Sequence, residues 1–267
     1  MKGLRDEYNL LEKISVWFGQ RSVVVYTMGK VGTLTICNSL RNSGFKHVHP
    51  HSLRYTRPGI HFLNINLSFF KKIKYTAWTV LKRIKVAMWK LLKSEIVIIT
   101  GVRDPYSRNI SAFFEQAHYI GGINTNLSYE ELKKIYDDVC DFTAPLYWFD
   151  EEILKVTGVN VYDYVFNKER GFTVINEGKY RIFIYRLDKL NGMRDELASF
   201  LNEKNFDIDS TNFSEETQYS GLMKLLKNNY RYDKSISEQY VNSKYMKHFF
   251  TEDEVRSFEN KWSLEPA

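Results

Sequence analysis

The feature that most constrains the fold is a continuous apolar run, Ile-Val-Ile-Ile-Thr-Gly-Val, between Glu95 and Arg103. A strand that is apolar at successive positions is buried on both faces, as in the centre of a parallel sheet. A second run, residues 22–26, is rich in valine and is followed by a glycine-rich turn and a helical pattern. The two runs together predict an α/β protein whose central parallel sheet is flanked by helices.

The other patterns alternate between strand and helix along the chain. We expect strands over residues 45–49, 95–102 and 180–185, helices over 33–42, 129–139, 148–156 and 190–201, and mainly helices from 214 onward. No repeat or low-complexity linker divides the chain. With 267 residues, of which 43% are hydrophobic, it is long enough to bury one core, so we predict a single domain over residues 1–267.

Cysteine content and the first residues favour a cytoplasmic protein. Cys37 and Cys140 are too few for a disulfide framework, and neither has the spacing of a metal ligand. Charged residues interrupt the apolar residues near Met1, so we expect no signal peptide or membrane anchor.

The net charge of +6 is concentrated in residues 68–94, which hold eight Lys and Arg and no Asp or Glu. Apolar residues recur there at helical spacing and predict an amphipathic basic helix. Such a helix could dock on anionic lipid at the inner membrane face, or on another polyanion. It could equally pack on the core through its apolar side. We expect no nucleic-acid partner.

The turn between Tyr26 and Thr33, Thr-Met-Gly-Lys-Val-Gly, has the form of an anion site. A strand, two glycines and a helix start present backbone N–H groups to a phosphate or sulfate, although a structural turn would also explain the glycines. The turn is not a Walker A loop, because that motif needs a further glycine five residues before Gly29 and a hydroxyl directly after Lys30, and both positions are valine. The usual magnesium ligand is therefore missing, which favours metal-free transfer over a kinase reaction.

A second element follows the strand that ends at Val102. Arg103 leaves the carboxyl end of that strand, where open α/β sheets bind ligands, and Ser111 lies two helical turns further on. Asp104 is placed to cap the helix, with Pro105 at its first position.

These two elements resemble the 5′-phosphosulfate loop and the 3′-phosphate motif R-D-P-x-x-R-x-x-S-x-F of sulfotransferases that use 3′-phosphoadenosine 5′-phosphosulfate (PAPS). Segments 148–153, 157–162, 245–250 and 260–263 resemble bacterial sulfotransferase-like proteins of capsular polysaccharide synthesis. The resemblance implies a P-loop-like sulfotransferase fold with PAPS as co-substrate and no metal. It implies that the 3′-phosphate is held by Arg103 and Ser111, and that the 5′-phosphosulfate is held by Thr27, Gly29, Lys30, Val31, Gly32, Thr33, Leu34 and Thr35.

A later stretch, residues 181–190, is similar to a family strand that ends in Arg-x-Glu-Asp-Leu. Leu187 and Lys189 depart from that pattern, which leaves a ligand role for Arg186 open.

Sulfuryl transfer needs a base, and His47, His49 and His51 follow one another at alternate positions. The segment resembles the His-x-His-x-Leu stretch of polysaccharide 2-O-sulfotransferases, in which a histidine is the base. One alignment selects His49 and His51 and the other His47 and His49; we favour His51 as base, with His49 beside it. A histidine-rich loop or an adventitious metal site is the alternative, and Glu115 with His118 forms a second acid–base candidate pair.

The sequence thus predicts a carbohydrate sulfotransferase in which a histidine deprotonates the acceptor hydroxyl and Lys30 stabilises the departing nucleotide phosphate. Two other hypotheses remain open at this point. One is a P-loop nucleotide kinase. The other is a non-enzymatic membrane- or polyanion-binding protein that uses the basic helix.

Overall fold

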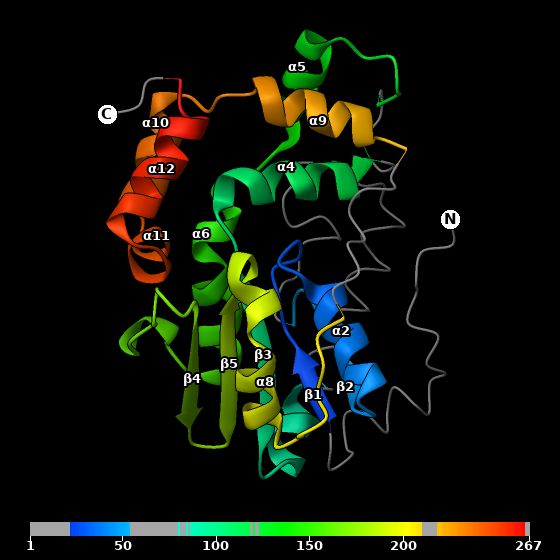
Figure 1. Ribbon diagram of the computed structural model, residues 1–267, viewed down its shortest axis with the longest axis vertical. Coiled ribbons are helices and arrows are strands. Elements are labelled where there is room, and N and C mark those ends of the chain that lie inside the picture. Colours follow the sequence, from blue (N-terminus) through cyan, green and yellow to red (C-terminus); the bar gives the residue numbers. More distant parts are fainter. Residues whose placement is uncertain are drawn as a thin grey trace.

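The computed structural model describes residues 22–53, 80, 84, 86–117, 120, 123–209 and 218–264. Its centre is a five-stranded sheet with helices on both faces (Figure 1). The order across the sheet is β2-β1-β3-β5-β4. The strands are β1 (Ser22–Val25), β2 (Lys46–Val48), β3 (Ile96–Val102), β4 (Phe172–Glu177) and β5 (Tyr180–Arg186).

Four of these strands are parallel and β4 is antiparallel to β5. The structure confirms the expected α/β class with a central, mostly parallel sheet flanked by helices. The edge strand β4 was not predicted, because within it only Ile175 is buried and the apolar pattern is correspondingly weak. It forms a hairpin with β5 that turns over Gly178, which has a positive φ of 54°.

The helical elements of the described residues are α2 (Thr33–Asn42), α4 (Pro105–Glu115), α5 (Tyr129–Val139), α6 (Ala144–Trp148), the π-helix η2 (Phe149–Leu154), α7 (Lys155–Thr157), the 3₁₀ helices η3 (Val161–Asp163) and η4 (Leu187–Gly192), α8 (Arg194–Leu201), α9 (Ser220–Asn229), α10 (Lys234–Asn242), α11 (Lys244–Phe249) and α12 (Glu252–Trp262). The helices expected at 33–42 and 129–139 are confirmed. The helix expected at 148–156 is wound partly as a π-helix, and the one at 190–201 begins as a 3₁₀ turn.

Along the central strands, successive side chains point to opposite faces of the sheet and pack into two separate hydrophobic cores. Val23, Val25 and Ile99 pack with α2 and α8, whereas Val24 and Ile98 pack on the opposite face with η2 and the C-terminal helices. Burial on both faces explains why these strands are apolar throughout rather than at every second position.

Only part of the basic helix expected at 68–94 belongs to the described residues: positions 80, 84 and 86–94. Residues 86–92 are helical there, and Trp89 is buried while Ile84 and Leu91 are exposed. Contact with a membrane surface stays a prediction. Within the described part of the chain, no helix combines the length and apolar character needed to cross a bilayer.

The strand order places a topological switch point between β1 and β3. From β1 the chain first adds β2 on one side and then crosses to add β3 on the other. Loops that leave the carboxyl ends of two such strands diverge and open a crevice in which α/β proteins bind ligands. The two predicted phosphate elements follow β1 and β3, so the topology brings them to the same end of the sheet, the end at which α4 and α9 lie in Figure 1.

Candidate functional site

The loop after β1 has an unusual backbone. Gly29, Lys30 and Gly32 have φ angles of 84°, 60° and 83°. Left-handed residues among right-handed ones gather backbone N–H groups into an anion-binding concavity, and a lysine held in this conformation is uncommon. Helix α2 begins directly afterwards, with no side-chain cap and no acidic residue in its first turn. Its first N–H groups therefore remain suited to an anion.

Three buried or half-buried donors hold the carbonyl groups of this loop. Arg108 Nη2 donates to Met28 O at 2.8 Å, Arg103 Nη1 to Lys30 O at 3.2 Å, and the Tyr185 hydroxyl to Val31 O at 2.8 Å. In a trans peptide the next N–H points opposite to the carbonyl. The amides of residues 29, 31 and 32 therefore face away from these donors, as an anion site requires.

Close packing on β5 explains two of the nearby glycines. A Cβ on Gly32 would lie 2.8 Å from Leu187 Cδ1 and 2.9 Å from Leu190 Cδ2. A Cβ on Gly101 would lie 2.6 Å from the ring of Tyr185, which crosses β3 at this point to reach the loop. The loop of residues 27–32 is thus fitted to the end of β5 and to η4 as well as to its own strand.

His51 contacts the start of this loop. Its Nδ1 lies 3.0 Å from Thr27 O, and because a carbonyl only accepts, Nδ1 must carry the proton. The neutral ring then has its lone pair on Nε2. The residue keeps an exposed edge, but the protein around the ring displaces water, and this desolvation lowers the pKa of His51 despite the opposing effects of the Thr27 carbonyl and Glu115. His51 is therefore neutral at pH 7 and can accept a proton.

The other histidines differ in placement. The His49 ring lies 5.8 Å from that of His51, between centroids, which agrees with its predicted place beside the base. His47 is 1% exposed inside β2 and therefore cannot reach an acceptor without unfolding of the strand. His118 lies outside the described residues. Glu115, its predicted partner, is exposed at the end of α4.

Hydroxyl groups lie as the sequence suggested around the loop. Thr27 Oγ1 and Thr33 Oγ1 are 2.8 Å apart and both residues are buried. Thr35 is half-buried on α2, and Leu34 points outward, with 41% of its surface exposed. A contact between Leu34 and a ligand would therefore rest on its backbone.

The element after β3 has the predicted cap. Asp104 Oδ1 accepts from Ser107 N at 2.8 Å, and Pro105 occupies the first turn. Arg103 Nε donates to Ser107 Oγ at 3.0 Å, and Ser111 Oγ donates to Ser107 O at 3.0 Å. Ser107 therefore lies between the two residues expected to bind the 3′-phosphate.

Positive charge accumulates at this end of the sheet. Burial lowers the pKa of Arg108 to about 10 and also lowers that of Arg103. Burial and then the charges of Arg103 and Lys30 lower the pKa of Lys227 on α9, a residue that the sequence analysis missed because nothing distinguishes it from a surface lysine. Lys30 Nζ lies 3.9 Å from Glu115, too far for a strong ion pair. The site is suited to a multiply charged anion.

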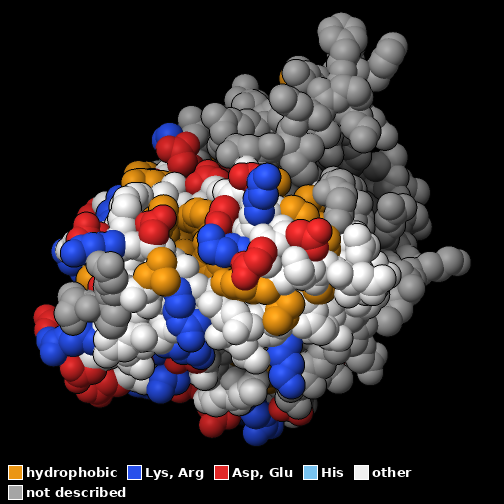
Figure 2. Space-filling model, turned by 90° about the horizontal axis from the view of Figure 1, so that it is seen from above, with side chains coloured by type: hydrophobic (Ala, Val, Ile, Leu, Met, Phe, Trp, Pro, Cys, Tyr) orange, Lys and Arg blue, Asp and Glu red, His pale blue; other side chains and the backbone are white. Residues whose placement is uncertain are grey.

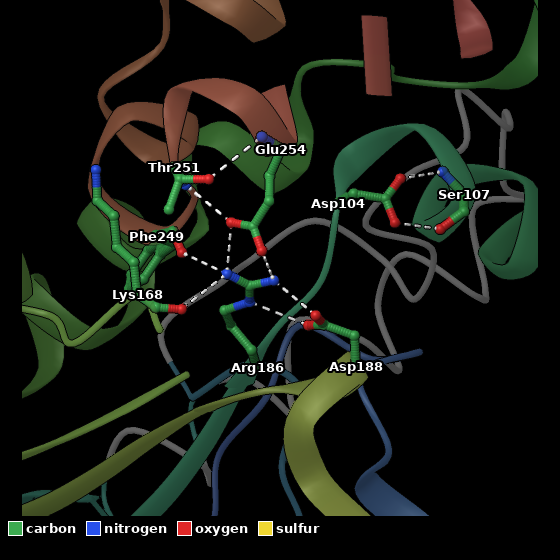
Figure 3. A network of polar contacts seen from close by, with 8 residues as sticks. All are labelled: Asp104, Ser107, Lys168, Arg186, Asp188, Phe249, Thr251 and Glu254. Atoms are coloured by element: carbon green, nitrogen blue, oxygen red, sulfur yellow. Dashed lines mark hydrogen bonds and ion pairs between the residues drawn. The ribbon is translucent and has the colours of Figure 1, made fainter. Parts of the chain in front are cut away.

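Arg186 has a different role from Arg103. Its side chain is 1% exposed and is enclosed by the carboxylates of Asp188 and Glu254, with the carbonyls of Lys168 and Phe249 beside them (Figure 3). Its Nη2 is 2.6 Å from an oxygen of each carboxylate. The structure thus answers the open question about Arg186: it is a structural cross-link between β5 and α12.

Elsewhere on the described surface, neither the charge pattern nor the shape indicates a second binding site. The face seen from the carboxyl ends of the strands carries acidic and basic side chains side by side over its described part (Figure 2). An open groove of about 520 Å³ lies between β4 and α8, lined by Phe172, Arg181 and Phe200 among others, and it includes none of the residues of the phosphate loop. No group of three or more potential metal ligands occurs among the described residues.

Comparison with known proteins links part of the chain to polysaccharide synthesis. The model of the NKWYS family, described as "Putative capsular polysaccharide synthesis protein", matches residues 122–251. This range is just under half of the chain; it includes β4, β5 and Arg186 but neither the phosphate loop nor Arg103. No curated protein and no solved structure gives a significant match.

Proposed function

We propose that this protein is a sulfotransferase that moves a sulfuryl group from PAPS to a hydroxyl group of a carbohydrate. The observation that carries the proposal is the approach of His51 Nδ1 to Thr27 O, at 3.0 Å. This contact joins a neutral histidine to a loop built for phosphate or sulfate. A base beside an anion loop is the minimum that transfer to a hydroxyl requires.

The donor set suits a nucleotide with phosphate groups at both ends. Around the loop, backbone amides and Lys30 would hold the 5′-phosphosulfate, while Arg103 and Ser111 would hold the 3′-phosphate. Among the described residues no carboxylate lies within ion-pair distance of Arg103, on whose pKa the charge of Asp104 nevertheless acts, and Lys30 has only the long contact to Glu115. Burial and then repulsion from Arg103 and Lys30 lower the pKa of Lys227, and an anionic ligand would relieve that repulsion.

His51 begins the reaction by accepting the proton of the acceptor hydroxyl on Nε2. The acceptor oxygen forms a bond to sulfur in line as the bond between sulfur and the bridging phosphate oxygen breaks. Lys30 stabilises the charge left on that oxygen, and the products are a sulfate ester and 3′-phosphoadenosine 5′-phosphate. His51 then returns its proton to water. Every step uses a side chain of the described site.

The proposal of a carbohydrate acceptor rests on the family match, since capsular polysaccharides are polymers of sugars with many free hydroxyl groups. A kinase reaction has less support. The position that carries the magnesium-binding hydroxyl in a Walker A loop is Val31, whose side chain is fully buried in the core.

Calorimetry with 3′-phosphoadenosine 5′-phosphate tests the donor site. We expect Lys30→Ala to weaken binding by about 10- to 100-fold, the effect of losing one charged hydrogen bond. The matched control is Lys204→Ala, an exposed lysine just beyond the end of α8, which should bind like wild type. Absence of binding by the wild type, or equal binding by both variants, would overturn the proposal.

Sulfate transfer to a panel of capsular glycans, followed by mass detection of the product, tests the reaction itself. Because Lys30 acts on the leaving phosphate as well as on bound donor, Lys30→Ala should lose more in turnover than in binding. Magnesium-dependent turnover of ATP without sulfate transfer would instead favour a nucleotide kinase.

A further inference from the structure

A heavily engaged carboxylate outside the described anion site belongs to Glu152. Its residue is 2% exposed and lies in η2, behind the sheet. Oε1 accepts a hydrogen bond from Ser52 Oγ at 2.7 Å, and Oε2 accepts from Leu53 N at 2.9 Å and from the Tyr26 hydroxyl. Three donors are enough to satisfy a buried carboxylate, so this group is built into the fold rather than left for a ligand.

The positions of these donors connect Glu152 to the proposed base. Ser52 and Leu53 directly follow His51, and Tyr26 directly precedes Thr27, whose carbonyl accepts from His51 Nδ1. Glu152 therefore fixes both of the segments that meet in the contact between His51 and Thr27.

Trp148, one helical turn before Glu152, holds the same segment. Its Nε1 donates to His51 O at 3.2 Å, and its ring packs edge-on against Tyr26 with centroids 5.2 Å apart. The indole of Trp148 thus holds the backbone of His51, and the carboxylate of Glu152 holds the two residues that follow it.

The helix that carries Glu152 has an unusual backbone. Residues from Phe149 to Leu154 form a π-helix, a rare form that is frequently found at functional sites. Ile153, fully buried in the same segment, anchors it in the core but has no part in the hydrogen bonds to residues 51–53.

The influence of Glu152 on His51 is geometric. The charged and titratable groups that act on the pKa of His51 are Glu115, His49 and Arg108, together with burial and the Thr27 carbonyl. Glu152 is not among them. It instead holds the loop in the position where His51 is desolvated and bonded to Thr27.

We propose that Glu152 is the positioning residue of the catalytic base: its carboxylate holds the turn at residues 51–53 so that His51 keeps Nδ1 on Thr27 O and Nε2 available for the acceptor hydroxyl. This inference rests on the proposed function. Glu152 lies outside the sequence motifs for nucleotide binding, which therefore give no information about it.

The test compares Glu152→Ala and Glu152→Gln, with Ile153→Ala as the control for loss of stability. A glutamine can reproduce all three contacts, because its oxygen accepts from Tyr26 and Leu53 while its amide donates to the hydroxyl of Ser52. The first measurement is NMR titration of the His51 ring without any substrate, assigned with His51→Asn.

We expect Glu152→Ala to release the turn, so that the pKa of His51 rises toward its ordinary value of 6.5. The Gln variant and Ile153→Ala, measured at a temperature where it is folded, should titrate like wild type. An unchanged His51 titration in Glu152→Ala, or the same shift in Ile153→Ala, would overturn the proposal.

Kinetics supply the second measurement. A displaced base should cost Glu152→Ala about 100-fold in kcat with little change in the affinity for 3′-phosphoadenosine 5′-phosphate, and the acid limb of its pH profile should move upward with the pKa of His51. Glu152→Gln should recover most of kcat. Equal losses in kcat and in nucleotide affinity would contradict a positioning role.

The two proposals can fail separately. If the wild type binds no nucleotide and transfers no sulfate, the proposed function is wrong, while the NMR titration still decides whether Glu152 positions His51.

Discussion

Two arginines at the ends of neighbouring parallel strands have opposite environments. Arg186 is the last residue of β5 and pairs in register with Val102, the last residue of β3, so that Arg103 is the first residue beyond β3. Arg186 is enclosed by two carboxylates, whereas Arg103 donates to a serine hydroxyl and to the Lys30 carbonyl. Within the described residues, Arg186 at this end of the sheet is ion-paired with carboxylates and Arg103 is not.

The difference is visible in the pKa of each guanidinium. Burial lowers the pKa of Arg103. Burial acts on Arg186 in the same direction, but its hydrogen bonds to Glu254 and Asp188 outweigh it and raise the pKa. Arg103 is half-buried, and the charge of Asp104 opposes the effect of burial on its pKa without forming an ion pair. A partly buried cation that lacks an ion-paired carboxylate gains from an anionic ligand. The comparison therefore separates an arginine with no ion-paired carboxylate among the described residues, which is suited to an anionic ligand, from one that joins β5 to α12.

The largest expected effect is on nucleotide binding by Arg103→Ala. Loss of a guanidinium that binds phosphate through two charged hydrogen bonds should weaken binding of 3′-phosphoadenosine 5′-phosphate by about 100- to 1000-fold, or about 3–4 kcal/mol. Calorimetry measures it. Arg103→Lys should fall between wild type and alanine, because it keeps the charge and loses the fork.

Thermal unfolding of Arg103→Ala sharpens the comparison. Because no carboxylate of the described residues is left unpaired, the midpoint should change little. A large loss of stability with unchanged nucleotide binding would show that Arg103 is structural, like Arg186.

The next largest effect is on folding in Arg186→Ala. Removing this side chain leaves Glu254 half-buried without its partner and should cost about 2–3 kcal/mol of unfolding free energy, less than for a wholly buried pair because Asp188 is half exposed. Urea denaturation measures it.

Arg170→Ala is the matched control for this variant. Arg170 also pairs with a glutamate, Glu196, at 2.8 Å, but it is exposed, so its loss should cost less than about 1 kcal/mol. Equal losses of unfolding free energy in the two variants would show that burial of Arg186 between two carboxylates does not strengthen its ion pair.

The smallest expected effect is a dependence of stability on acid pH. Burial alone would raise the pKa of Glu254, but hydrogen bonds from Arg186 and Thr251 lower it below the ordinary value of 4.5. The unfolded state therefore takes up its proton first as pH falls, and stability should decrease below about 4.5 as pH passes through the lowered pKa.

Urea midpoints across this acid range, in wild type and Glu254→Gln, test the effect. The variant should start less stable at neutral pH and show a shallower loss on acidification. Parallel curves for the two proteins would mean that another carboxylate controls the acid limb.

Sequence reasoning located the parts of the molecule that follow from local chemistry. Apolar runs gave β1 and β3, Asp104 and Pro105 gave the start of α4, and glycines gave the turn after β1. The left-handed Gly44 after α2 agrees with the expected end of that helix. Each of these features is set by residues within a few positions of one another.

What the sequence could not supply depends on contacts between distant residues. Glu152 has the pattern of any helical glutamate until its partners, about 100 residues away, are known. The role of Arg186 likewise depends on Glu254, and the exclusion of His47 depends on its burial in β2. The edge strand β4 was missed because an exposed strand lacks a strong apolar signal.

The hydrogen bond from Tyr185 to Val31 links residues 154 positions apart. The hairpin of β4 and β5 can pair locally, but Tyr185 reaches the loop only after β5 has joined β3 and β3 has joined β1, which are closures of long chain segments. We therefore expect the anion loop to be among the last parts of the protein to form during folding. Only molecules in which β1, β3 and β5 have already paired would then bind the nucleotide proposed for this loop.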